Sequence, residues 1–313
     1  MKKIALVALA TTMLTSGAMA ETVGVSMAKF DDNFLTVLRN GIDEYAGTLD
    51  GVEIQIEDAQ NDVSKQMSQI QNFIASGVDA IVVNPVDTDA TEAMSALAEQ
   101  AGVPLVYVNR QPVNLDNLPD NQAFVASNEV DSGTLETKEV CRLLTEAGKT
   151  EANILVIMGE LSNQAARQRT QDIHDVIATP ECSFMKIVEE QTSNWDRTQA
   201  ADLMTNWLSA GIKFDAVVAN NDESAIGAIQ AMKAAGMDMA SVVVGGVDAT
   251  QDALAAMQAG DLDVTVFQNA AGQGSGALDA ALALSRGETV DREVWIPFEL
   301  VTPANIADYL SAN

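Results

Sequence analysis

The sequence predicts an α/β fold with two similar, doubly wound parallel-sheet domains, and three observations carry this prediction. Short β-branched runs alternate with longer segments of helical period along most of the chain. The alternation occurs twice, once in each half. The phrase VDAIVVNPVDTDA at 78–90 is nearly repeated as FDAVVANNDESA at 214–225. Alternating strands and helices imply parallel sheets covered on both faces, so the repeat predicts two domains built on one plan.

The expected elements follow the same order in both halves. In the first half we expect strands at 22–27, 52–58, 80–84 and 103–109, and helices at 33–49, 64–77 and 90–102. In the second half we expect strands at 153–158, 183–190, 215–220 and 241–247, and helices at 163–178, 197–211 and 224–236. The two similar phrases are the third strand of each half. Ligands of open α/β sheets lie beyond the carboxyl ends of the strands, so these phrases are expected to line one cleft.

The last part of the chain is expected to return to the first domain. After residue 260 it carries another strand, a helix and a strand at 294–300, which we expect to complete the first sheet. We predict an N-terminal lobe of residues 21–127 plus 269–299 and a C-terminal lobe of residues 128–268 plus 300–313. Several crossings of the chain between the lobes would form a hinge about which they move as rigid bodies.

The first residues predict export. Lys2 and Lys3 precede an apolar run, and residues 18–20 read Ala-Met-Ala, a small-residue cleavage site. The apolar run is shorter than the roughly 20 residues that a membrane span needs. An uncleaved anchor is the alternative interpretation. We predict that residues 1–20 are a cleaved signal peptide and that the mature protein is periplasmic, beginning near Glu21.

The composition narrows the possible partners. The chain has 45 acidic and 17 basic residues, which gives a formal net charge of −28 at pH 7. Such a surface repels phosphate backbones and anionic lipid. We therefore expect no nucleic-acid partner and no direct membrane insertion, and we expect a monomer.

The two cysteines are Cys141, late in an expected helix, and Cys182, just before an expected strand. Helix ends and strand starts lie on the same side of a parallel sheet, so the two sulfurs could meet. In an oxidising compartment a disulfide there would be worth roughly 4 kcal/mol in the chain-entropy model. Two buried free thiols are the alternative.

Polar side chains and aromatic rings follow the carboxyl ends of the expected strands. A polyhydroxylated ring needs this mixture, because each hydroxyl both donates and accepts while the C–H faces lie on aromatic rings. Arg167 and Arg169 are two apart on a helix, so only one is expected to reach the cleft. The candidate ligand-binding residues are Phe30, Asp31, Asp32, Phe34, Asn84, Asn109, Arg110, Asn128, one of these two arginines, Trp195, Asn221, Asp248 and Gln268.

Some of these candidates have structural alternatives. Asp31 and Asp32 could cap the helix that follows them, Phe34 could belong to the core, and Phe30 could form a lid. Signals for catalysis are poor, because His174 is the only histidine and falls within an amphipathic helix. A histidine-based zinc site or a Ser-His-Asp triad therefore lacks its residues. We expect no catalytic residues, no metal and no cofactor, hence no enzyme.

Seven motifs together resemble the type I periplasmic binding proteins for sugars, close to the ribose-binding branch. They are NPVDTDA, NRQP, VASNEVDSG, QAARQR, NWDR, NNDESAIGA and VVVGGVDAT, spread over essentially the whole mature chain. The resemblance implies two lobes that close on a ligand. It implies ligand contacts at Asp32, Phe34, Arg110, Arg169, Trp195, Asn221, Asp248 and Gln268, with Phe30 nearby.

Three positions depart from the ribose pattern. Asn109 stands where that branch has an aspartate, Leu35 where it has a second phenylalanine, and Val247 where it has an aromatic residue. An asparagine donates as well as accepts, which fits a cyclitol. The motifs KFDDNFLTVLRNG, NPVDTDA and YVNRQP most resemble the inositol- and rhizopine-binding members of the family.

The resemblance implies a substrate-binding protein of an ABC importer. It would capture myo-inositol, a related cyclitol or rhizopine, or else a monosaccharide, and present it to a membrane permease. The alternative is a ligand-sensing periplasmic receptor whose closed form docks a sensor kinase or chemoreceptor. A sugar-responsive repressor shares the core fold, but the predicted signal peptide and the lack of a helix-turn-helix segment before residue 22 argue against it.

Overall fold

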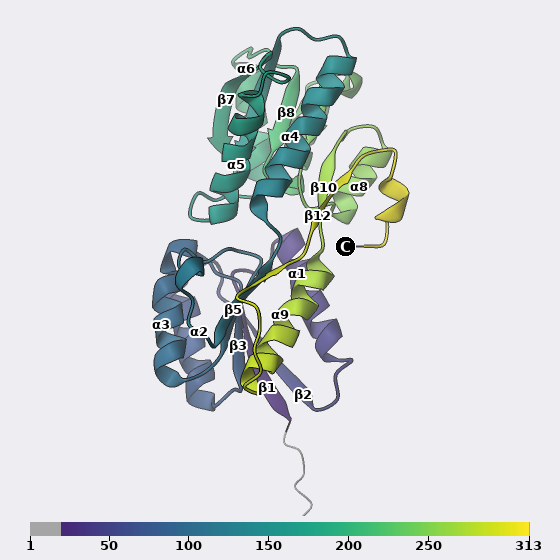
Figure 1. Cartoon of the computed structure of the whole chain (residues 1–313). Helices are drawn as coiled ribbons and strands as arrows, with labels where there is room; N and C mark the ends of the chain where they lie inside the picture. Colours follow the sequence, from purple (N-terminus) through teal and green to yellow (C-terminus); the bar gives the residue numbers. More distant parts are fainter. Residues whose placement is uncertain (1–19, 313) are drawn as a thin grey trace, which may run out of the picture.

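The computed structural model describes residues 20–312, so residues 1–19 of the predicted signal peptide lie outside the described residues. It has two lobes, one above the other in Figure 1, each with its own sheet. Among the described residues, no helix combines the length and the apolar character needed to cross a membrane.

The N-terminal lobe is built on a six-stranded parallel sheet in the order β11-β5-β4-β3-β1-β2. Its strands are β1 (Glu21–Met27), β2 (Val52–Asp58), β3 (Ala80–Val83), β4 (Leu105–Val108), β5 (Gln122–Ala126) and β11 (Glu293–Trp295). Every residue of β3, β4 and β5 is buried, as strands covered on both faces require.

Helices cover both faces of this sheet (Figure 1). Helices α1 (Asn33–Ala46) and α9 (Ala270–Ser285) pack on one face, where Leu38, Ile42 and Leu278 join the apolar core. Helices α2 (Val63–Ser76) and α3 (Thr91–Ala101) pack on the other, through residues such as Phe73 and Met94. The short 3₁₀ helix η1 (Thr88–Ala90) precedes α3.

The C-terminal lobe repeats the plan with a four-stranded parallel sheet in the order β7-β6-β8-β9. Its strands are β6 (Ala152–Met158), β7 (Met185–Thr192), β8 (Ala216–Ala219) and β9 (Val243–Gly245). Helices α4 (Glu129–Glu146) and α5 (Gln164–Ile177) cover one face. Helices α6 (Arg197–Ser209), α7 (Asp222–Ala234) and α8 (Gln251–Gln258) cover the other. The α/β class and the parallel sheets are as predicted.

The last strands differ from the prediction. The segment 294–300 is two strands, and only β11 joins the first sheet. Strands β10 (Thr265–Gln268) and β12 (Phe298–Val301) instead pair antiparallel with each other. Bridges from Gly245 of β9 to Val264 and from Asp248 to Phe267 attach β10 and the residue before it to the C-terminal lobe. The expectation that all these strands complete the first sheet was wrong. Pro297 separates β11 from β12 because it has no N–H to continue a strand ladder.

Cys141 of α4 and Cys182, which precedes β7, form a disulfide with their Cα atoms 5.7 Å apart. Both cysteines are buried with Val140, Leu144 and Met185 in the core beneath α4 and α5. The bond joins a helix end to a strand start, at the end of the sheet away from the carboxyl ends of its strands. It therefore stabilises the C-terminal lobe far from the cleft.

Candidate functional site

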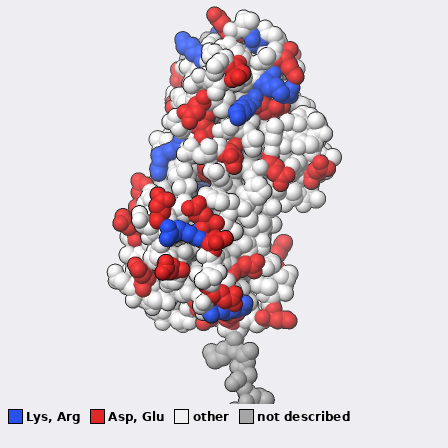
Figure 2. All heavy atoms as spheres, viewed as in Figure 1, with Lys and Arg blue, Asp and Glu red and all other residues white. Residues whose placement is uncertain are grey.

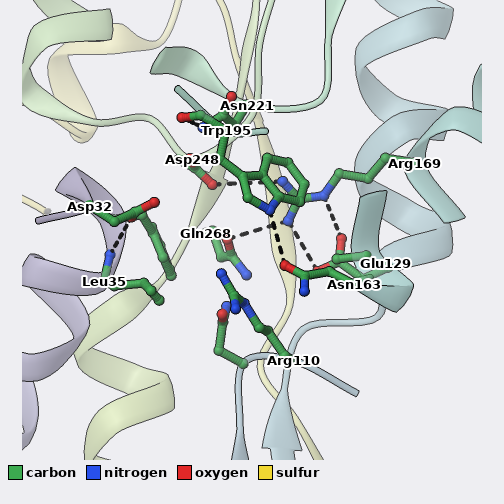
Figure 3. A pocket seen from close by; sticks show the side chains of 13 residues that line it. Asp32, Leu35, Arg110, Glu129, Asn163, Arg169, Trp195, Asn221, Asp248 and Gln268 are labelled. Carbon is green, nitrogen blue, oxygen red and sulfur yellow. Dashed lines mark hydrogen bonds and ion pairs between the residues drawn. The ribbon is translucent and has the colours of Figure 1, made fainter. Parts of the chain in front are cut away.

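A pocket lies between the two sheets, at the carboxyl ends of their strands (Figure 3). It is lined by Asp32, Phe34, Leu35, Asn109, Arg110, Glu129, Asn163, Ala165, Arg169, Trp195, Asn221, Asp248 and Gln268. Both lobes contribute, so the pocket exists only while they are close together. Arg110 reaches it from the N-terminal lobe, and Arg169 from α5 of the C-terminal lobe.

Three residues that line the pocket have positive backbone φ angles, and each lies shortly after the end of a strand. Asn109 after β4 has φ 68°, Trp195 after β7 has φ 63°, and Asp248 after β9 has φ 125°. A residue other than glycine held in such a region costs of order 1–3 kcal/mol and clusters at functional sites. Each of these sharp turns ends a strand and directs its side chain into the pocket. The sequence placed these residues at strand ends but gave no sign of the turns.

Trp195 forms one wall of the pocket. Its indole Nε1 donates to Oδ1 of Asn163 at 3.0 Å, and only 8% of the residue is exposed. The ring lies against Gly159, where an added Cβ would come within 2.2 Å of ring atoms. Glycine is thus required at 159 for the ring to lie flat. An apolar ring face with a satisfied N–H suits stacking against the C–H face of a ligand.

Arg169 is the centre of a buried charge network in the C-terminal lobe. Its Nε and Nη2 donate to the two carboxylate oxygens of Glu129 at 2.6 and 3.0 Å, and Nη1 donates to the carbonyl of Asn220 at 2.7 Å. Burial lowers the pKa of Arg169, but Glu129, Asp248 and Glu136 together outweigh burial and raise it overall. The guanidinium therefore stays charged, and the bidentate pair fixes its plane.

Asp248 lies opposite this guanidinium, with Oδ1 3.9 Å from Nη1 of Arg169. Burial raises the pKa of Asp248 well above its usual range, although the charge of Arg169 opposes the shift. Its carboxyl is therefore biased toward the protonated form, which both donates and accepts. Such a group can serve a ligand hydroxyl in either role.

The N-terminal lobe supplies Arg110 and Asp32. Nη1 of Arg110 donates to the carbonyls of Pro85 at 2.8 Å and Val86 at 3.3 Å. Burial lowers the pKa of Arg110 against the opposing charges of Glu160 and Asp32. Asp32 caps α1 by accepting from the backbone N–H of Leu35 at 2.9 Å, and it also lines the pocket. The capping and ligand-contact interpretations of Asp32 are thus compatible.

Four candidates do not line the pocket. Phe30 and Asp31 lie in the wider groove outside it, where the guanidinium of Arg39 lies 4.4 Å from the ring centre of Phe30. Asn84 is fully buried beneath the pocket. Asn128 caps α4 by accepting from the N–H of Val130 at 3.2 Å. Strand ends and crossovers place a residue near a cleft, but they do not tell which side of the turn its side chain takes.

Sequence reasoning missed four lining residues, which are Leu35, Glu129, Asn163 and Ala165. All lie at or near the first turn of a helix that follows a strand. A search extended from strand ends to the next helical turn would have found them. Of the arginine pair, Arg169 is buried in the pocket, while Arg167 is exposed and its Nη2 lies 3.6 Å from Oδ1 of Asp89. One arginine of the pair therefore reaches the cleft, as expected.

Hydrogen bonds join the two lobes at the rim of the pocket. Thr88 of η1 donates from its backbone N and from Oγ1 to the carbonyl of Ser162, at 3.2 and 3.0 Å. Its Oγ1 also accepts from the N–H of Gln164 at 3.2 Å. Asn163 donates to the carbonyl of Val86 at 3.1 Å. These bonds require the lobes to be together, so this is a closed arrangement.

The surface around this region is acidic. Figure 2 shows acidic side chains over both lobes, with fewer basic ones among them. The groove outside the pocket contains Asp31, Asp58, Asp87, Glu160 and Asp196. Within residues 20–312, no cluster of histidine, cysteine or acidic side chains has the arrangement of a metal site.

Comparisons with known proteins give one consistent family. Residues 23–289 match the family described as periplasmic binding protein domain. The chain is 68% identical over 313 residues to a protein of Rhizobium meliloti that is provisionally named rhizopine-binding, covering 100% of each chain. It is 31% identical over 281 residues to a ribose import binding protein of Bacillus subtilis, covering 90% of this chain and 87% of that one.

Solved structures give the same picture. An ABC transporter solute-binding protein of Bacillus halodurans with bound myo-inositol is 40% identical, with a TM-score of 0.88 over 96% of this chain and 100% of that one. A Caulobacter myo-inositol binding protein bound to myo-inositol is 28% identical, with a TM-score of 0.81 over 92% and 94%.

Proposed function

This chain belongs to the periplasmic binding protein family, and we propose that it captures a cyclitol of the myo-inositol or rhizopine type between its lobes. It is a substrate-binding protein of an ABC importer and not an enzyme. Its curated relatives are binding or import proteins, which favours transport over a receptor that docks a sensor kinase or chemoreceptor.

The arrangement of Arg110, Arg169 and Trp195 around one pocket is the observation that carries the ligand class. Two guanidinium groups from opposite lobes offer charge-assisted donors, while Asp32 and Asp248 offer oxygen atoms that accept. A neutral ring bearing hydroxyls satisfies both kinds of partner, and its C–H face can lie on the indole. The bound myo-inositol of the Bacillus halodurans relative supports a cyclitol over a pentose.

Capture would proceed by closure of the two lobes. We propose lobes of residues 21–127 plus 269–299 and 128–268 plus 300–313, with hinge segments where the chain passes between them. The bonds from Thr88 and Asn163 across the pocket rim support closure, because they would break if the lobes separated. The closed form would then be presented to the membrane permease of the importer.

The site of action would be the periplasm. Membership of a periplasmic family supports export, and the Lys2-Lys3 start with its apolar run supports a signal peptide removed before Glu21. We propose that the mature protein acts as a monomer.

The test is ligand binding by the mature chain from Glu21. Calorimetry and thermal unfolding with myo-inositol, ribose, galactose and xylitol should give the strongest binding and stabilisation with myo-inositol. A ligand at 100 times its Kd stabilises the fold by about 2.7 kcal/mol. Trp195→Leu should abolish the effect, while Trp295→Leu, at an exposed tryptophan outside the pocket, should preserve it. The proposal would be contradicted if none of these four compounds stabilised the protein.

A further inference from the structure

Four buried polar side chains form a continuous hydrogen-bonded chain beneath the pocket. Nδ2 of Asn84 donates to Oδ1 of Asn109 at 3.2 Å, and Nδ2 of Asn109 donates to Oε1 of Gln273 at 3.2 Å. Nε2 of Gln273 then donates to Oγ of Ser127 at 3.0 Å. All four are at most 8% exposed. We call this set the amide relay. Only Asn109 of the four lines the pocket.

Backbone groups fix the direction of the amide relay. The backbone N–H of Ala28, which can only donate, points to Oδ1 of Asn84 at 3.3 Å. Nδ2 of Asn84 therefore faces the other way and donates to the carbonyl of Val108, which can only accept, at 3.3 Å. Because Asn84 presents a donor to Asn109, the oxygen of Asn109 must face Asn84. Its nitrogen must then face Gln273.

This direction decides what Asn109 can offer a ligand. Its Nδ2 carries two hydrogens, and Oε1 of Gln273 accepts one of them. The left-handed backbone at Asn109, with φ 68°, holds the amide at the pocket lining. An aspartate at 109 would offer only acceptor oxygens. Gln273 is itself fully buried and is not part of the pocket lining, so it acts on the pocket through Asn109.

We propose that Gln273 is a positioning residue that holds Asn109 as a hydrogen-bond donor to the ligand. Position 109 then selects a ligand oxygen that accepts, whereas the oxygens of Asp32 can accept from a ligand hydroxyl. This assignment rests on the proposed polyol-binding function. It makes Gln273, on α9, a determinant of affinity although it does not touch the ligand.

A double-mutant cycle on myo-inositol binding tests the amide relay. Gln273→Met keeps the side-chain size but removes the acceptor for Asn109 and the donor to Ser127, and the loss of the hold on Asn109 should raise Kd roughly tenfold. Asn109→Gly removes the side chain without straining a positive φ. In the Asn109→Gly background, Gln273→Met should change Kd less than about twofold, because the partner through which it acts is gone.

Two further variants separate positioning from a general packing defect. Gln273→Glu retains an oxygen that accepts from Asn109, and its buried carboxyl, which burial keeps protonated, can still donate to Ser127, so Kd should stay within about threefold of that of the parent protein. Gln122→Met makes the same change at another buried glutamine, which donates to the carbonyl of Ser95 at 2.9 Å and does not line the pocket. It should lower thermal stability and leave Kd unchanged. An unchanged Kd in Gln273→Met, or an equal change in both backgrounds, would overturn the proposal.

Failure of the proposed function can be told apart from failure of the amide relay. If the parent protein binds none of the polyols, the proposed function fails. The amide relay is then judged in the unliganded protein from the side-chain amide NMR signals of Asn109. A shift of these signals in Gln273→Met but not in Gln122→Met supports it, and unchanged signals in both overturn it.

Discussion

Asp222 is a buried acidic residue of the C-terminal lobe that does not line the pocket. Its Oδ1 accepts from Thr265 Oγ1 at 2.7 Å, and its Oδ2 accepts from the backbone N of Thr250 at 2.8 Å. These bonds attach the start of α7 to β10 and to the start of α8. Burial nevertheless raises the pKa of Asp222 to about 7, because these donors do not replace the water that it loses. The raised pKa of Asp222 therefore makes the stability of the C-terminal lobe depend on pH.

Replacing Asp222 should change how stability depends on pH. The unfolded aspartate loses its proton near pH 4, whereas the folded one loses it near pH 7. Between these values the folded state binds more protons, so this residue makes stability fall as pH rises from about 4 to about 7. Asp222→Asn should remove this part, flattening the slope by up to about 1.4 kcal/mol per pH unit.

Urea unfolding at a series of pH values measures this slope. Asp202→Asn is the matched control, because it removes the same charge from an exposed position on α6. It should leave the slope of the parent protein in place. A slope that is the same in Asp222→Asn and in the parent protein would show that Asp222 is already ionised in the folded state at pH 5.

Single residues also show how far the sequence could predict the site. Arg110, Trp195 and Asp248 were candidates because they follow the ends of expected strands, whereas Arg169, which lies on α5, was separated from Arg167 only by the family resemblance. Asn84 lies beneath the pocket and not in its lining, because an asparagine at a strand end can also satisfy buried backbone groups, as it does with Ala28 and Val108. Glu129 was missed because acids in a first helical turn are common helix stabilisers. Only its contact with Arg169 reveals a second role.

At the scale of elements, the sequence pattern predicted the positions of most helices and of most strands in the two parallel sheets. Strand β5 was not among the expected strands, although α4 begins only three residues after it ends. The β10–β12 pair was assigned to the wrong sheet because the sequence pattern of a strand does not indicate which other strand it pairs with. Antiparallel pairing of two strands far apart in sequence is decided by the packing of the hinge region, which includes Val247, Val266 and Phe298.

The disulfide between α4 and β7 should stabilise its lobe without affecting the ligand. It joins residues 41 apart, and a loop of that size is worth roughly 4 kcal/mol in the chain-entropy model. Cys141→Ala with Cys182→Ala should therefore lower the free energy of unfolding by a few kcal/mol, as measured by urea denaturation. The Kd for myo-inositol should stay the same, because both residues lie at the far end of the sheet from the pocket.

Urea unfolding of the parent protein and of the double variant in the presence of a reducing agent provides the control. A reductant should lower the stability of the parent protein toward that of the double variant and should leave the double variant unchanged. A large loss of ligand affinity in the variant would instead mean that the amino ends of the strands and the pocket are coupled.

At the scale of the whole molecule, the closed arrangement depends on a small set of bonds between the lobes. Thr88 provides several of them, because its backbone N and its Oγ1 both reach the carbonyl of Ser162 and its Oγ1 accepts from Gln164. Thr88 is fully buried in this state. In an open state these groups would face water, so the bonds stabilise only the closed state.

Thr88→Val should therefore weaken closure without changing the lobes themselves. It keeps the shape of the side chain and removes the bonds made by Oγ1, which leaves the N–H of Gln164 without that acceptor in the closed state. The loss of about 1 kcal/mol should appear mainly as a fivefold to tenfold faster release of myo-inositol, with little change in association. Stopped-flow fluorescence measures both rates.

Thr137→Val is the matched control, because Thr137 is equally buried but lies within α4, and its hydroxyl has no hydrogen-bond partner. It should release the ligand at the parent rate. Small-angle scattering should show the parent protein contracting on myo-inositol addition and Thr88→Val contracting less completely at the same ligand excess. Equal release rates for all three proteins would mean that ligand contacts alone hold the lobes together, and that the bonds at the rim follow closure without stabilising it.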